Sequence, residues 1–387
     1  MDRRSFVIST GVLTSQLLVG CSGNNKVKFN VELLKNSLPA EVVGQFRRTL
    51  KPNTEISVTL FEQFQDIFQK LENWQKKPSH QDKNNYNLFE WLRRRPFGKA
   101  EHESTDLLTL SDFWLREAIE KKLIQPIDMS LVQQWSALPK QWQELVTRND
   151  KGFVDPQGKI WGAPYRWGNT VIVYHRDRFK RNRWAPPQDW ADLWREELRD
   201  RISLLNHPRE VIGLVLKKLN KSYNTTDLNS VPELESELQK LNQQVKFYGS
   251  TKYIEPLLLG DTLLAVGWSQ DILPAIARYP YLVAVVPQSG TTQSADVWVS
   301  PTGRHQHELL KQWVNFLWQP NIARQIALLT RSHSPIATQI NPSDIQEPLR
   351  NLLLINPDIL KRSEFLLPLP LEVEQQYVNL FERIKNS

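Results

Sequence analysis

The feature that most constrains the fold of this chain is a repeated alternation of short apolar segments with amphipathic ones. The short segments are rich in β-branched residues, as in 170–174 (TVIVY). They predict strands at 56–60, 106–110, 170–174, 202–205, 245–248, 262–268, 281–286 and 296–300. The amphipathic segments predict helices at 61–74, 112–123, 189–200, 209–219, 305–318 and 320–330. Strands and helices that alternate in this way are typical of an α/β protein with mostly parallel sheets.

Two of the predicted helices begin with recognisable local signals. Ser111 comes directly before the helix at 112–123, where a serine hydroxyl can accept a hydrogen bond from a free backbone N–H group. Pro208 suits the first position of the helix at 209–219, because a backbone N–H group at that position has no partner within the helix and proline has none to leave unpaired. Open α/β sheets bind ligands at the carboxyl ends of their strands, so a protein with two such lobes is expected to capture a ligand between them.

The N-terminal segment is typical of an export signal. Arg3 and Arg4 precede a mostly apolar run over 6–20, which is short for a membrane-spanning helix but suits the core of a signal peptide. We therefore predict a signal peptide over residues 1–20. Paired arginines occur in twin-arginine signals and in ordinary ones, so both export routes stay open.

The only cysteine of the chain, Cys21, follows this segment directly. With Gly20 before it, the sequence 18–21 (LVGC) resembles the lipobox of bacterial lipoproteins, which implies a lipid thioether on Cys21. Two or more acyl chains hold a protein on a membrane stably. The polar residues that follow predict a lipidated tether over 21–27. The alternative is an ordinary N-terminal core segment with an inert thiol.

The length of the chain predicts two domains. From residue 21 to residue 387 the chain is longer than one hydrophobic core usually serves. No later segment has the continuous apolar stretch that a membrane-spanning helix needs. A lipidated Cys21 leaves no cysteine for a disulfide, so packing alone must stabilise the exported body.

Positive charge is concentrated in one segment. Residues 76–99 contain seven Lys and Arg residues against Asp82 and Glu90, a net charge of +5. We interpret about 76–104 as a solvated basic insertion, because runs of charge are usually solvated. Contact with anionic lipid headgroups beside the anchor is the alternative, and nucleic acid is not an expected partner of an exported protein.

Several short motifs point in order to one family. They are 162–168 (GAPYRWG), 190–194 (WADLW), 208–211 (PREV), 264–269 (LAVGWS), 286–287 (VP) with Asp296 downstream, and 314–317 (VNFL). Together they resemble the spermidine/putrescine-type periplasmic binding proteins of ABC importers. The resemblance covers roughly 100–340 and is weak before residue 100.

This resemblance implies a two-lobed periplasmic-binding-protein fold of type 2, with the ligand in a cleft between lobes that close by a hinge motion. Its crossover strands fall near 166–169, near 294–297 and after His333. The implied lobe boundaries are 28–167 with 296–340 for lobe 1, which contains the basic insertion, and 168–295 with 341–387 for lobe 2.

The resemblance also implies the binding residues. An amine ligand needs carboxylates for its ammonium groups and an aromatic face for its methylenes, and each charge-assisted hydrogen bond contributes about 1.5–3 kcal/mol. Glu210 and Asp296 fall on the amine-binding carboxylates of the family, Trp268 on a pocket tryptophan and Ser111 on a polar pocket residue. Further candidates are Asp112, Phe113, His207 and Asp271. Each has a structural alternative: Glu210 suits a first helical turn, Asp296 could cap a turn and Trp268 could be core.

Four positions depart from the pattern of the family. His207 stands where the family has an acid, Phe113 replaces a tyrosine and Ser294 replaces a common pocket tryptophan. No Trp/Tyr pair follows the first strand near 30–38. A protonated His207 would repel a polycation.

We therefore expect a monomeric, lipid-anchored binding protein of the periplasm or cell envelope, without a cofactor, that delivers a polyamine such as spermidine or putrescine to an ABC importer permease. One alternative is the same receptor fold with a different solute, including an anionic one. Another is a degenerate surface lipoprotein that acts in assembly or regulation rather than in transport.

A surface-anchored enzyme is the alternative from another class. The chain contains no G-x-S-x-G, H-E-x-x-H or G-x-G-x-x-G motif and no phosphate loop, so we predict that it is not an enzyme. The nearest cluster of metal-ligating residue types is 305–308 (HQHE). Its histidines are two residues apart and would point to opposite sides of a helix, which indicates an exposed helix start and no metal site.

Overall fold

The computed structural model describes residues 27–75, 105–130, 132–304, 308–336, 340–345, 347 and 349–387. The predicted signal peptide, Cys21, nearly all of the tether and the basic insertion lie outside the described residues, as do residues 305–307. Within the described ranges no helix is both long enough and apolar enough to cross a membrane.

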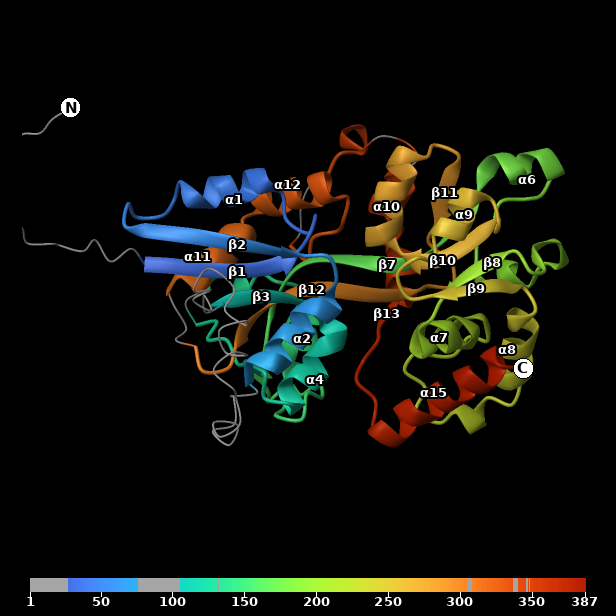
Figure 1. Cartoon of the computed structure of the whole chain (residues 1–387), viewed down its shortest axis with the longest axis horizontal. Helices are drawn as coiled ribbons and strands as arrows, with labels where there is room; N and C mark the ends of the chain where they lie inside the picture. The colour runs from blue at the N-terminus through green and yellow to red at the C-terminus, as the bar shows by residue number, and fades with distance from the viewer. Residues whose placement is uncertain are drawn as a thin grey trace, which may run out of the picture.

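One large sheet runs through the described part of the molecule (Figure 1). Its strand order is β2 (Thr54–Phe61), β1 (Val27–Leu34), β3 (Leu107–Ser111), β12 (Thr292–Pro301), β7 (Ala163–His175), β10 (Leu264–Trp268), β8 (Ile202–Leu205) and β9 (Val245–Gly249). Three further strands join it from the side: β11 (Leu282–Val285) on β7, and β4 (Ile124–Gln125) and β13 (Glu364–Phe365) on β12. A separate small sheet pairs β5 (Thr147–Arg148) with β6 (Lys159–Ile160).

The prediction of mostly parallel sheets is wrong for the centre of this sheet. The outer pairs β1–β2, β1–β3, β8–β10 and β8–β9 are parallel. In contrast, β7 and β12 are antiparallel to each other, β12 is antiparallel to β3, and β7 is antiparallel to β10 and β11. The reason is that these two long strands return through the middle of the sheet between two parallel groups, so the sheet as a whole is mixed.

The strands β7 and β12 connect the two halves of the molecule. The first half of β7 pairs with β12, and its second half, from Thr170 on, pairs with β10. Figure 1 shows both strands crossing the middle, with β1, β2 and β3 on one side and β8 to β11 on the other. A third segment touches the same region, since Trp167 forms an isolated bridge with His333.

Helices cover the sheet on both sides of this centre. They are α1 (Ala40–Arg47), α2 (Phe64–Gln75), α4 (Leu115–Glu120), α5 (Lys140–Val146), α6 (Arg176–Asn182), α7 (Pro208–Lys218), α8 (Leu234–Asn242), α9 (Glu255–Leu259), α10 (Ser269–Arg278), α11 (Glu308–Leu317), α12 (Pro320–Thr330), α13 (Arg350–Leu353), α14 (Pro357–Arg362) and α15 (Leu371–Lys385). The two predicted start signals are confirmed: Ser111 accepts a hydrogen bond from the N–H group of Phe113, and Pro208 opens α7.

The predicted helix at 189–200 is wrong. The chain forms two short 3₁₀ turns there, Trp190–Trp194 and Glu196–Leu198, separated by extended backbone at Arg195. The break lets Trp190, Leu193 and Leu198 all enter the core, where each is fully buried. The indole N–H of Trp190 also donates to the carbonyl oxygen of Gly290, so tertiary packing overrides the helical pattern.

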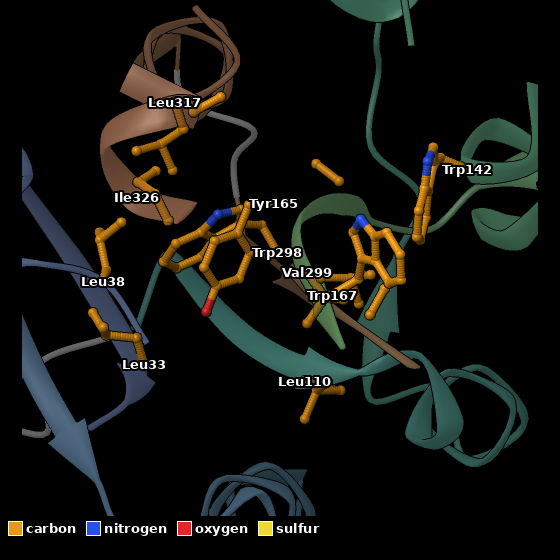
Figure 2. Packing of buried hydrophobic residues seen from close by; sticks show 14 of the residues in the cluster. Leu33, Leu38, Leu110, Trp142, Tyr165, Trp167, Trp298, Val299, Leu317 and Ile326 are labelled. Carbon is orange, nitrogen blue, oxygen red and sulfur yellow. The ribbon is translucent and has the colours of Figure 1, made fainter. Parts of the chain in front are cut away.

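The described residues form two hydrophobic cores, of which the first extends from β1, β2 and β3 across the crossing strands to α9, α10 and β11. In the first core Trp298 of β12 packs against Tyr165 of β7, with ring centroids 4.8 Å apart, as Figure 2 shows. In the same core Trp142 packs against Trp167 with centroids 5.4 Å apart. The second core lies under α7, α8 and α15. Neither core includes the polar side chains of the cavity described below.

Candidate functional site

A cavity of about 460 Å³ opens where strands of both halves of the sheet end. Its lining comprises Leu34, Glu62, Gln63, Phe64, Gln65, Ser111, Asp112, Phe113, Trp114, Arg166, His207, Glu210, Ser250, Thr251, Trp268, Gln270, Asp271, Gln293, Ser294, Asp296 and Leu366. The structure thus brings all eight sequence-predicted binding residues together in one place. Two groups of side chains carry all of its charged residues except Glu62.

The first group, which we call the tryptophan wall, consists of His207, Glu210, Trp268 and Asp271. Glu210 lies in the first turn of α7 and is buried. The indole N–H of Trp268 donates to Oε1 of Glu210 at 3.2 Å, and the Thr170 hydroxyl donates to Oε2 of Glu210 at 3.0 Å. Burial raises the pKa of Glu210, and these neutral donors oppose the shift.

Asp271 belongs to the same wall through a shared tyrosine. The Tyr253 hydroxyl donates to Asp271 Oδ2 at 2.7 Å and accepts from the backbone N–H of Trp268 at 3.1 Å. The side chain of Asp271 keeps exposed surface, yet the surrounding protein atoms desolvate it because it lies in a concave site, and this raises its pKa. Glu210 and Asp271 therefore flank one tryptophan, and both are held by uncharged donors.

His207 caps the first turn of α7 and is neutral. Its Nδ1 accepts from the backbone N–H of Glu210 at 3.3 Å, so the ring proton is assigned to Nε2. Burial, with a smaller contribution from the positive charge of Arg209, lowers the pKa of His207 to about 4. The repulsion expected from a protonated imidazole at this position is therefore absent at neutral pH.

The second group, which we call the arginine wall, consists of Asp112, Arg148, Arg166 and Asp296. Arg166 and Asp296 are direct cross-strand partners on β7 and β12. The Nε of Arg166 donates to Oδ2 of Asp296 at 2.5 Å, and both side chains are buried. Burial lowers the pKa of Arg166, but Asp296 and Tyr165 together raise it more, so the guanidinium stays charged. One of the two carboxylates that the resemblance assigns to the amine thus already has an internal cation.

The negative charge of Asp112 is stabilised by hydrogen bonds and by a guanidinium group that does not line the cavity. Its Oδ1 accepts from the backbone N–H of Ala295 at 2.9 Å and from the Ser294 hydroxyl at 3.0 Å. The buried guanidinium of Arg148 donates to the backbone carbonyl of Asp112 at 3.3 Å and attracts its carboxylate. Burial nevertheless raises the pKa of Asp112 to about 6, so this carboxyl changes charge in mildly acidic solution.

One aromatic contact joins the two halves across the cavity. Phe113 follows β3 and its ring lies edge-on to the His207 ring, with centroids 5.1 Å apart. Ser111, next to it, lies 3.1 Å from the hydroxyl of Ser294. The phenylalanine that replaces a tyrosine of the family thus serves as an apolar contact to the opposite wall.

The sequence analysis did not assign several lining residues to the site. Glu62 to Gln65 follow the carboxyl end of β2, Ser250 and Thr251 follow β9, and Arg166 lies within β7. The rule that ligands bind at the carboxyl ends of parallel strands could have found the first two groups. Arg166 gave no such signal, because its role depends on the register of two strands far apart in sequence.

The lining as a whole is acidic. It contains five carboxylates, of Glu62, Asp112, Glu210, Asp271 and Asp296, against the single guanidinium of Arg166. Glu62 is exposed and pairs with Lys35 at 2.7 Å. Among the described residues, no cluster of three or more His, Cys, Asp or Glu side chains could hold a metal ion.

Comparison with known proteins gives the family. A model of the family described as bacterial extracellular solute-binding protein matches residues 102–360, more than half of the chain. The chain belongs to this family. This solute-binding protein is 26% identical over 268 residues to the putrescine-binding periplasmic protein PotF of Escherichia coli, an alignment that covers 65% of this chain and 71% of the relative. It is 28% identical over 222 residues to the spermidine/putrescine-binding periplasmic protein of Salmonella typhimurium, covering 57% and 61%.

Solved structures agree on the fold. The spermidine/putrescine ABC transporter substrate-binding protein PotD of Streptococcus pneumoniae matches with a TM-score of 0.73 at 18% identity, over 93% of this chain and 99% of that one. The lipoprotein Tp0655 of Treponema pallidum matches with a TM-score of 0.67 at 15% identity, over 93% and 100%. The predicted α/β periplasmic-binding-protein fold of this solute-binding protein is confirmed, whereas its lobe boundaries stay a prediction.

Proposed function

We propose that this solute-binding protein captures a small organic amine of the polyamine type in the cavity and delivers it to an ABC importer. The observation that carries the proposal is the charge of the lining, where carboxylates outnumber the guanidinium and Trp268 offers an aromatic face beside two of them. Desolvated carboxylates favour a bound cation, and an indole face adds a cation–π contribution of about 0.5–2 kcal/mol. The names of the relatives support the same ligand class.

The charge of the cavity argues against an anionic solute. An anion would have to approach Glu210 and Asp271, whose hydrogen-bond donors are uncharged, and the neutral His207 supplies no positive charge. The cavity also lies within the range of about 300–1,000 Å³ that small-molecule sites occupy.

The proposal includes the division into lobes and the lipid anchor. Lobe 1 would comprise 28–167 and 296–340, and lobe 2 would comprise 168–295 and 341–387. The two long strands that cross the middle of the sheet support a hinge between such lobes. Cys21 would carry the lipid, and the chain would act as a monomeric, non-enzymatic, membrane-anchored receptor of the periplasm or cell envelope.

Calorimetric titration of the full-length protein in detergent tests the ligand class. We expect saturable binding of putrescine or spermidine, and a thermal stabilisation of about 2.7 kcal/mol at a hundred times the dissociation constant. Titration of phosphate and glutamate is the matched comparison. Binding of an anion without binding of any amine would refute the proposal, and loss of membrane association in Cys21→Ser tests the anchor separately.

A further inference from the structure

The arginine wall has no net charge to offer a solute. Asp296 is paired with Arg166, and the carboxylate of Asp112 is opposed by Arg148 behind it. An ammonium group that enters this wall loses its hydration and meets two carboxylates whose charge two guanidinium groups already balance. The wall does offer hydrogen-bonding groups, namely the hydroxyls of Ser111 and Ser294 and the amide of Gln293.

The tryptophan wall has the opposite character. Within their described surroundings, the carboxylates of Glu210 and Asp271 accept hydrogen bonds only from threonine hydroxyls, an indole and a phenol. The charge of Arg209 attracts the carboxylate of Glu210, but its guanidinium donates to the side-chain oxygen of Asn224 at 2.9 Å and lies over the Tyr377 ring. Within the described residues neither carboxylate of this wall has a cationic hydrogen-bond partner, so both can accept a hydrogen bond from a cationic group of the ligand.

From this asymmetry we infer that Arg166 is a specificity-determining residue, which takes the place of one positive charge of the solute, so that the preferred ligand is an amine with one cationic end and one uncharged, hydrogen-bonding end. The ammonium group of such a ligand would lie at Glu210 and Trp268, and its polar neutral end would lie at Ser111 and Ser294. An N-acylated diamine has this pattern. The inference rests on the proposed amine binding and narrows it.

Both electrostatics and position support the role of Arg166. Its guanidinium lies in the lining, and its charge also lowers the pKa of Asp271 against the upward effect of burial. The positive charge of Arg166 thus attracts a carboxylate on each wall, Asp296 and Asp271. An anionic end on the ligand is disfavoured, because Asp112 and Asp296 lie beside the only guanidinium of the lining.

The test compares three probes by calorimetry on the full-length protein in detergent: putrescine with two positive charges, N-acetylputrescine with one, and 4-aminobutanoate with one charge of each sign. We expect N-acetylputrescine to bind about tenfold more tightly than putrescine, the size of one charge-assisted interaction. Arg166→Met removes the ion-pair partner of Asp296, so this variant should bind putrescine more tightly than N-acetylputrescine. The double variant Arg166→Met with Asp296→Asn also lacks the carboxylate of Asp296, so it should again bind N-acetylputrescine more tightly than putrescine.

Each remaining outcome has a defined meaning. Arg176→Met is the matched control, since Arg176 also pairs with an aspartate but is exposed on α6, and it should keep the wild-type preference. If Arg166→Met does not fold, the ratio of the dissociation constants of putrescine and N-acetylputrescine, measured on the wild type and on the double variant, still tests the inference. Tighter binding of putrescine than of N-acetylputrescine by the wild type would overturn the inference and leave the proposed function intact. If 4-aminobutanoate bound most tightly of the three probes, the inference that the ligand has a neutral end would be wrong. If no amine bound at all, the proposed function itself would be wrong.

Discussion

The two walls of the cavity each contribute two carboxylates, yet they handle the charge in opposite ways. On the arginine wall, Asp112 and Asp296 each have a buried arginine from the same chain. On the tryptophan wall, Glu210 and Asp271 have only uncharged donors. The difference teaches that the number of acidic residues in a site does not give its charge, because a buried carboxylate attracts a ligand only where the protein has not already supplied the counter-ion.

The largest test of this comparison removes the charge of Glu210. In Glu210→Gln we expect the affinity for the bound amine to fall ~100-fold, or about 3 kcal/mol, the upper range of a charge-assisted hydrogen bond in a desolvated site. Calorimetry with the amine probes measures it. Glu255→Gln, which changes an exposed first-turn glutamate of α9, should leave the affinity unchanged. Equal binding by Glu210→Gln and the wild type would place the cation outside the tryptophan wall.

The second test uses the titration of Asp112 on the arginine wall. Burial raises its pKa to about 6, so the native protein holds this proton more strongly than the unfolded chain, and ionisation costs stability as the pH rises from about 4 to about 6. Relative to the wild type, Asp112→Asn should therefore gain about 2–3 kcal/mol in free energy of unfolding between pH 4 and pH 7. Urea denaturation at a series of pH values measures the difference.

A control with the opposite sign accompanies this test. A hydrogen bond from Lys311 lowers the pKa of Asp128, so Asp128→Asn should lose stability relative to the wild type as the pH rises from the acidic range. If the two variants show the same pH dependence, Asp112 is not the buried acid described here.

The third test weakens the aromatic part of the tryptophan wall. Trp268→Leu removes a face for the cation and the indole donor to Glu210, so we expect a loss of about 1 kcal/mol, roughly fivefold in affinity. Trp194→Leu is a matched control, because Trp194 is also partly buried with a hydrogen-bonded indole but lies outside the cavity. A loss of similar size in both variants would indicate general destabilisation and no cation–π contact.

The smallest expected effect concerns the contact between the two halves. Phe113→Ala removes the edge-on contact with His207, which should weaken amine binding by about 0.5 kcal/mol, roughly twofold. Phe247→Ala, at another partly exposed phenylalanine, should have no effect on binding. An increase in affinity in Phe113→Ala would mean that the contact holds the cavity in a form that competes with the ligand.

Much of the fold could be predicted because its signals are local. The apolar segment at 202–205 has the bounds of β8, and Pro208 and Ser111 mark helix starts through backbone chemistry alone. The segment at 189–200 failed, since the packing of Trp190 decided its conformation and no local pattern reports that packing. The antiparallel centre of the sheet likewise depends on contacts between distant strands.

The site shows the same limit. The eight predicted residues meet in one cavity because the order of the motifs fixes which strand ends lie together. The ion pair of Arg166 with Asp296 could not be predicted, since it requires the register of β7 against β12, and the two residues are 130 positions apart in the sequence. The low pKa of His207 also arises from tertiary burial, which the residues next to it in sequence do not determine.

The pairing of Arg166 with Asp296 across two neighbouring strands has an evolutionary consequence. Neither residue belongs to a hydrophobic core, and both lie on the strands that join the two halves of the molecule. A single codon change at position 166 can therefore alter how many charges the receptor accepts while the cores stay intact. Homologous importers could in this way come to transport different solutes through a change in one cross-strand pair, while they keep the same fold.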